Sequence, residues 1–150
     1  MSREILFLLI HNELPVRERL FRIRLAVDPY CEHCFGPSGA VVCDLEHFFC
    51  ACSRVIRVWE RLKVMIAQFL TVEETDLSDS DLINLHLPRN RNSNEVIWLI
   101  GSYVGEVWSC LVIKSAAKLS GDKFFGFLKF KYKMDQLGAR LPLNPIPGLL

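Results

Sequence analysis

Apolar residues recur at helical spacing along most of the chain. In the segment 53–70 they lie three or four positions apart, the period of one helix face, and Ser53 is placed to cap its start. The residues predicted to be buried on that face are Val55, Trp59, Leu62, Ile66 and Phe69. Residues 3–23 predict two shorter helical segments separated around Asn12 and Pro15. Only residues 39–43, GAVVC, alternate as a strand would, so the pattern predicts a mainly α-helical fold.

The second half of the chain changes pattern twice. The stretch from Glu73 to Asp81 is acidic, and a run of Arg, Asn and Ser follows Pro88, as is typical of a surface connection. Apolar positions then resume, with Gly121 placed to end a first long helix before a second one. The predicted division is a first module at 1–70, an acidic and polar linker or surface loop at 71–93, C-terminal helices at 94–138 and a proline-rich tail at 139–150.

The segment Val96–Ile113 is apolar over about the length that crosses a bilayer. Glu106 lies near its middle, and a central carboxylate costs several kcal/mol in hydrocarbon. A helix buried between other helices accounts for the same apolar run. We therefore predict a core helix, with a membrane span as the minor alternative.

Composition narrows the class of protein. The chain has 150 residues, of which 51% are hydrophobic and 23% charged, and this excludes an intrinsically disordered chain. The formal net charge is +1, so any attraction to nucleic acid must come from a local basic patch. The start lacks the basic leader and long apolar run of a secretory signal. This predicts an intracellular protein, nuclear or cytoplasmic, with reduced cysteines.

Five of the six cysteines lie between Tyr30 and Cys52. Their spacing is Cys31-x2-Cys34, then twelve residues, then His47-x4-Cys52. Three thiolates and one imidazole form a ligand set that Zn²⁺ accepts in closed structural sites. The FGPSG sequence after Cys34 supplies the turn that reverses the chain, and a short helix from Asp44 would present His47. The pattern predicts a small helical domain built around a zinc knuckle with ligands Cys31, Cys34, His47 and Cys52.

Other interpretations of the same cysteines remain open. Cys43 or Cys50 could replace Cys52 as the fourth ligand, and His33 is a weaker candidate. A redox pair would need a strand and helix context, and a disulfide scaffold would need export. A DNA-reading zinc finger is disfavoured, since acids would stand where its helix meets the phosphate-lined groove.

The motifs ELPVRERLFRI, CEHC, DLEHFFCAC and VWERL together resemble a known family. It is the zinc-binding segment found C-terminal to the polymerase domain of non-LTR retrotransposon reverse transcriptases. The match covers roughly residues 3–63. The matching positions are Leu14, Pro15, Arg17, Arg19 and Leu20 in the first motif, Cys31 and Cys34 in the second, His47 and Cys52 in the third, and Trp59 in the fourth. The family has a Glu shortly before its His, where this chain has Asp44 and Glu46.

The resemblance implies a non-catalytic part of a reverse transcriptase that helps to hold template RNA or target DNA. Its partners would be RNA or DNA, bound weakly and without sequence preference, and a polymerase domain. The chain shows no paired-aspartate strand for nucleotide transfer, so we do not expect an enzyme. The candidate nucleic-acid-binding residues are Arg17, Arg19, Arg22 and Arg24 in one segment and Arg54, Arg57 and Arg61 in another. The alternative function is a structural or protein-interaction module whose zinc only holds helices together.

Overall fold

The computed structural model describes residues 3–36 and 39–137. The helices are α1 (Arg3–Ile10), α2 (Arg17–Arg22), α3 (Ile56–Leu70), α4 (Asp79–Ile83), α5 (Ser93–Val107) and α6 (Gly121–Leu137), with shorter turns η1 (His47–Ala51), η2 (Glu74–Asp76) and η3 (Trp108–Ile113). The strands are β1 (Tyr30–Gly36) and β2 (Gly39–Val42). The predicted proline-rich tail, 139–150, lies outside the described residues.

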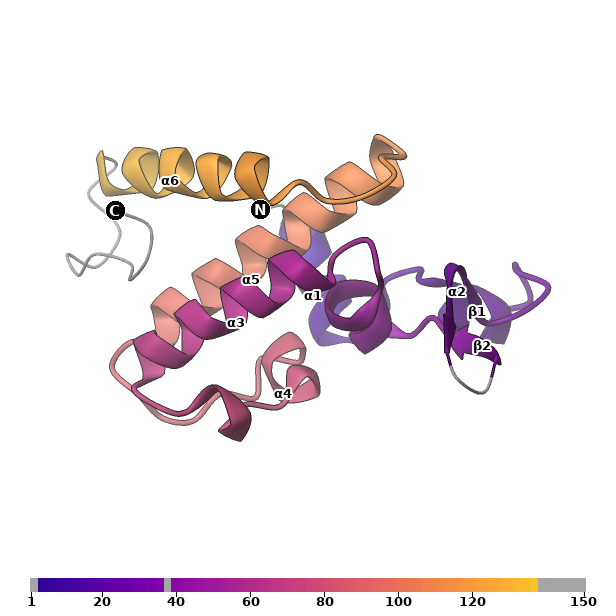
Figure 1. The fold of residues 1–150 in the computed structure, drawn as a ribbon, viewed down its shortest axis with the longest axis horizontal. Coiled ribbons are helices and arrows are strands. Elements are labelled where there is room, and N and C mark those ends of the chain that lie inside the picture. Colours follow the sequence, from indigo (N-terminus) through magenta and orange to yellow (C-terminus); the bar gives the residue numbers. More distant parts are fainter. Residues whose placement is uncertain (1–2, 37–38, 138–150) are drawn as a thin grey trace.

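The prediction of a mainly α-helical fold was wrong, because the chain combines helices with a β-hairpin. Helices account for 59% of the structure, and β1 pairs with β2 in an antiparallel two-stranded sheet. The hairpin and α2 lie together at one end of the molecule, at the right of Figure 1. Gly36 pairs with Gly39 where the hairpin turns, and the φ of Gly39 is 103°, which a side chain would strain. The chain does reverse after Cys34, as predicted, but between two strands.

The hydrophobic core is formed mainly by α3, α5 and α6. Figure 1 shows α3 and α5 running alongside each other, with α6 above them on the side of α5. All five apolar residues predicted for the 53–70 helix are buried. Tyr103 of α5 stands at the centre, with its ring 5.3 Å from that of Trp59 and 5.6 Å from that of Phe124. These aromatic contacts join the three helices.

The segment 71–93 also contributes to this core. Ser78 caps α4 by accepting a hydrogen bond from the backbone N–H of Asp81, and Leu82 and Ile83 are buried. Asp79 accepts a hydrogen bond from the Trp59 indole at 2.9 Å. The acidic stretch therefore packs against α3 through an apolar turn and a carboxylate.

The helix α5 continues into η3, so that Ser93–Ile113 forms one apolar helical run. By length and composition alone it could cross a membrane. Half of its most apolar window is buried inside the protein, as a core helix requires. The run ends at Ile113, and Ser115 adopts a left-handed conformation with φ 52°. Gly121, predicted to end this helix, instead begins α6.

Candidate metal centre

Two of the clustered cysteines come from the strand β1. In a regular strand, side chains three positions apart point to opposite faces of the sheet. The pairing is irregular here, since Tyr30 faces Val42 while Phe35 faces Ala40, so five steps along β1 match two along β2. The extra residues bulge out of the ladder and allow Cys31 and Cys34 to turn toward one side. The strand irregularity is therefore what lets a Cys-x2-Cys pair on one strand face one site.

The other two residues come from the turn around η1. The Asp44 carboxylate accepts a hydrogen bond from the His47 backbone N–H at 2.8 Å and starts this turn as a helix cap does. Cys52 lies directly after η1, where the backbone becomes extended. The short helix predicted to present His47 from its first turn, with Cys52 beyond its end, is present.

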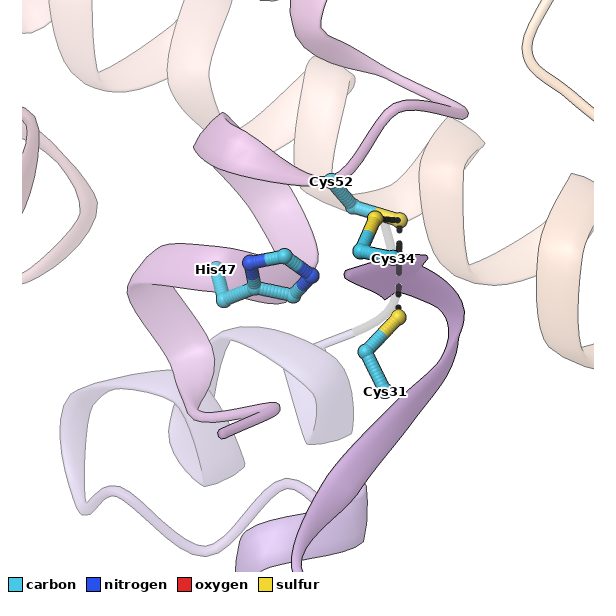
Figure 2. Close-up of side chains that lie close together, drawn as sticks. All are labelled: Cys31, Cys34, His47 and Cys52. Atoms are coloured by element: carbon cyan, nitrogen blue, oxygen red, sulfur yellow. Dashed lines mark hydrogen bonds between the residues drawn. The ribbon is translucent and has the colours of Figure 1, made fainter. Parts of the chain in front are cut away.

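The four predicted ligands converge on one point. The ligand atoms of Cys31, Cys34, His47 and Cys52 all lie within 4.8 Å of one another. The Cys52 sulfur is 3.9 Å from that of Cys31 and 3.8 Å from that of Cys34. Figure 2 shows the three sulfurs gathered together with the His47 ring directed at them. In a tetrahedral site with Zn–S bonds of about 2.3 Å, the sulfurs are about 3.8 Å apart. The group can therefore hold a metal ion.

The ligand atoms of this group lie in an environment that favours a bound cation. The Nε2 atom of His47 is buried and has no hydrogen-bond partner among the described residues. A buried polar nitrogen of this kind is costly unless something binds it. All six cysteines are free, so the sulfurs are not joined as disulfides. A metal ion would satisfy the imidazole nitrogen and the three sulfurs together.

Hydrogen bonds to sulfur surround the group. The backbone N–H of His33 donates to Cys31 Sγ at 3.4 Å, and that of Ser53 donates to Cys34 Sγ at 3.3 Å. Arg54 Nε donates to Cys52 Sγ at 3.3 Å. Donors of this kind stabilise thiolates and orient metal ligands. Ser53 was predicted to cap α3, but α3 begins at Ile56 and Ser53 instead serves the cysteine cluster.

The protonation of the four groups differs. Burial raises the pKa of Cys31 to about 12, whereas burial of Cys52 is outweighed by its contacts with His47 and Arg54, which lower its pKa to about 5. Burial also opposes ionisation of Cys34, but hydrogen bonds from Ser53 lower its pKa. The contact with Cys52 raises the pKa of His47 against the opposing effect of burial. These directions favour the thiolate form at Cys52, and a bound metal would displace the protons that the other ligands keep.

The competing ligands lie outside this group. Burial raises the pKa of Cys43 to about 11, and Cys50 is 1% exposed with its pKa also raised by burial. His33 is exposed to solvent. Of the candidates for the fourth position, Cys52 is the one that the structure brings to Cys31, Cys34 and His47.

The candidate nucleic-acid-binding arginines fall into two different environments. Arg17 pairs with Asp28 at 3.2 Å and Glu32 at 2.8 Å. Arg19 pairs with Glu13, and Arg22 with Glu18. By contrast, Arg54, Arg57 and Arg61 have no ion pair within the described part of the chain, and neither has Arg24. The charges of Arg54, Arg57, Arg61 and Arg24 are therefore available to a ligand, and the first three lie together on α3 and at its start.

Sequence reasoning missed the residues that support the ligands. Tyr103 lies more than fifty positions from the cluster, yet its hydroxyl donates to the Phe49 carbonyl inside η1. Arg54 reaches back to Cys52 across the sharp bend between η1 and α3. Neither contact has a local sequence signal, because both depend on how η1 packs against α3 and α5. An aromatic residue with a polar tip on an otherwise apolar helix was the available clue to Tyr103.

Comparison with known proteins gives no match: no family model, no curated protein and no solved structure is significantly similar to this chain.

Proposed function

We propose that the chain is a non-catalytic, zinc-stabilised module from a retroelement reverse transcriptase that assists binding of RNA or DNA. The observation that carries the proposal is the convergence of Cys31, Cys34, His47 and Cys52 at spacings that match a tetrahedral site. Zinc is favoured over harder cations because three of the four ligands are thiolates. A reducing intracellular compartment, nuclear or cytoplasmic, fits the six free cysteines.

The nucleic-acid half of the proposal rests on different residues. The motifs that resemble the reverse transcriptase segment include the cluster itself and the helix after it. Arg54 lies just before that helix, and Arg57 and Arg61 lie on it. None of the three arginines forms an ion pair with a carboxylate within the described structure. Contacts to phosphate oxygens need such groups and give binding without sequence preference.

Metal analysis with cysteine variants tests the zinc half. The purified wild-type chain is expected to carry about one zinc ion, since a structural site is closed by four protein ligands. Cys31→Ser and Cys52→Ser should lose it, while Cys43→Ser and Cys50→Ser serve as matched controls in the same segment and should keep it. A metal-free wild type, or equal loss in the Cys50→Ser control with retained helical circular dichroism, would refute the site.

Oligonucleotide binding tests the other half. The zinc-loaded chain should bind single-stranded RNA or DNA at low ionic strength, and the affinity should fall steeply as salt is added. Absence of binding at low salt would refute the nucleic-acid role while leaving the zinc site in place.

A second candidate function is a docking module for a polymerase domain or another protein. It is favoured by the apolar side chains that lie open around α2 and the hairpin: Leu25 is 73% exposed, Val27 88% and Phe35 84%. This function predicts self-association or poor solubility of the isolated chain, which light scattering after gel filtration would detect. A monodisperse monomer at high concentration would count against it.

A further inference from the structure

A cavity of about 380 Å³ lies between the start of α3 and the chain segment that leads into α6. We call it the basic pocket; its lining includes Arg54, Arg57, Arg61, Lys118, Asp122 and Phe125. The backbone N–H of Leu119 donates to the Arg54 carbonyl at 3.0 Å and fixes the two walls together. The basic pocket is therefore built by residues more than fifty positions apart, and it is separate from the metal ligands.

Carboxylates compensate little of the charge of the basic pocket, although Arg54 also donates to Cys52 Sγ. Four cations line it against a single lining carboxylate, that of Asp122, and none of the four forms an ion pair among the described residues. Four cations around one cavity repel each other, so an anion bound there would be favoured. This contrasts with Arg17, Arg19 and Arg22, which already hold carboxylates.

Two of the four cations are positioned by other groups. The Arg61 guanidinium stacks over the Phe125 ring at 3.9 Å from its centroid. Arg54 lies over Phe48 at 5.7 Å and donates to Cys52 through Nε, which leaves its remaining N–H groups for a ligand. Guanidinium groups held in this way suit bidentate contacts to phosphate oxygens, since little side-chain freedom is lost on binding. At about 380 Å³ the cavity is far larger than the space that one water molecule needs, so a phosphate group fits.

We propose that the basic pocket binds a backbone phosphate of RNA or DNA and anchors the strand beside the metal centre. The inference rests on the proposed function and locates its nucleic-acid contact on α3 and the 118–122 segment rather than on α2. Lys118 thereby joins the interface, although it lies far along the sequence from the zinc motif. Asp122 limits the affinity, because its carboxylate repels the same phosphate.

Charge-neutral variants measured by fluorescence anisotropy test this placement. The assay uses the full zinc-loaded chain and a labelled single-stranded oligonucleotide over a range of salt concentrations. The Arg57→Gln/Lys118→Gln variant should weaken binding about tenfold or more at low salt and reduce the salt slope by about one, because the pocket holds one phosphate. The Arg89→Gln/Lys114→Gln variant removes the same net charge outside the pocket and should bind within about twofold of wild type.

The opposite change should act in the opposite direction. Asp122→Asn removes the repulsive carboxylate and should tighten binding severalfold, an outcome that partial unfolding cannot produce. If the wild type binds but the pocket and control variants weaken it equally, the basic pocket is refuted and the proposed function stands. If the wild type does not bind at low salt, both fail. If inorganic phosphate competes as well as an equal concentration of oligonucleotide, the pocket is a small-anion site and the strand proposal is overturned.

Discussion

The helical end and the hairpin end of the molecule are each stabilised by different interactions. At the helical end, the rings of Trp59, Tyr103 and Phe124 are at most 1% exposed and pack against each other. At the hairpin end, only Cys31 and Cys43 are buried among the described residues from 20 to 43. A segment that buries so little apolar surface gains little from the hydrophobic effect. It needs another source of order, and the converging ligands supply one.

Under the proposed function, most of the hairpin's stability comes from the bound zinc ion. Removing the ion with a chelator, or by Cys34→Ser, should therefore release the 20–43 segment while α3 and α5 stay folded. Apparent binding energies of structural zinc sites are about 10 kcal/mol or more, so this is the largest effect expected. Hydrogen exchange read by mass spectrometry would show lost protection in β1 and β2 but not in α5.

The control for this experiment is Cys110→Ser. Cys110 is a free cysteine in η3 and is not part of the ligand group. The Cys110→Ser substitution should leave both the zinc content and the hydrogen exchange of the hairpin unchanged. Equal protection of β1 with and without zinc would mean that the hairpin is held by packing after all.

A truncation in the helical core should show the reverse pattern. Leu99 is 0% exposed in α5, and Leu99→Ala should cost about 3 kcal/mol or more of unfolding free energy through the cavity that it leaves. The loss should appear in the cooperative thermal transition of the whole helical end. Ile97→Ala, on the same helix but 36% exposed, is the matched control and should cost about 1 kcal/mol or less. Similar losses for both variants would contradict the placement of the core.

The two ends also differ in how far they could be predicted from sequence. The face of α3 was predictable because five apolar residues repeat at helical spacing and all five are buried. The four ligands were predictable because a tetrahedral ion constrains which spacings can meet. The alternation of residues 39–43 indicated β2, but β1 was missed because YCEHCFG does not alternate: the bulge that turns Cys31 and Cys34 to one side removes the two-residue period. Where a site requires a bulge, the alternation of apolar and polar residues that identifies a strand is lost.

Two predictions of helix ends were wrong for a related reason. Ser53 and Gly121 are residues that favour helix starts and stops, yet tertiary contacts use them differently. Ser53 donates its N–H to Cys34, and Gly121 lies at the wall of the basic pocket, where an added Cβ would lie 3.8 Å from the Val58 side chain. Local propensity is a weak guide wherever a ligand or a packed neighbour competes for the same residue.

Tyr103→Phe would measure how strongly the two ends are coupled. Burial raises the pKa of Tyr103 well above its usual value, so the hydroxyl keeps its proton and donates to the Phe49 carbonyl in η1. The variant keeps the ring but leaves that carbonyl unpaired, at a cost of about 1 to 2 kcal/mol. If the ends are coupled through this bond, the variant should also release zinc faster to a chelator. A lower melting temperature with unchanged zinc release would show that the bond serves the core alone.

Asp44 provides the smallest test, and it acts on the metal end only. Its carboxylate accepts the His47 N–H at 2.8 Å, so it positions a ligand without touching the ion. Asp44→Ala should cost about 1 kcal/mol as the loss of a helix cap and should weaken zinc affinity by a similar amount, about fivefold. Asp44→Asn keeps an acceptor oxygen at the cap and should behave nearly as wild type. Competition with a chromogenic chelator would measure both affinities, and the melting temperature of the helical end should not move in either variant. If Asn were as damaging as Ala, the carboxylate would act through its charge, and η1 would be held by electrostatics rather than by the cap.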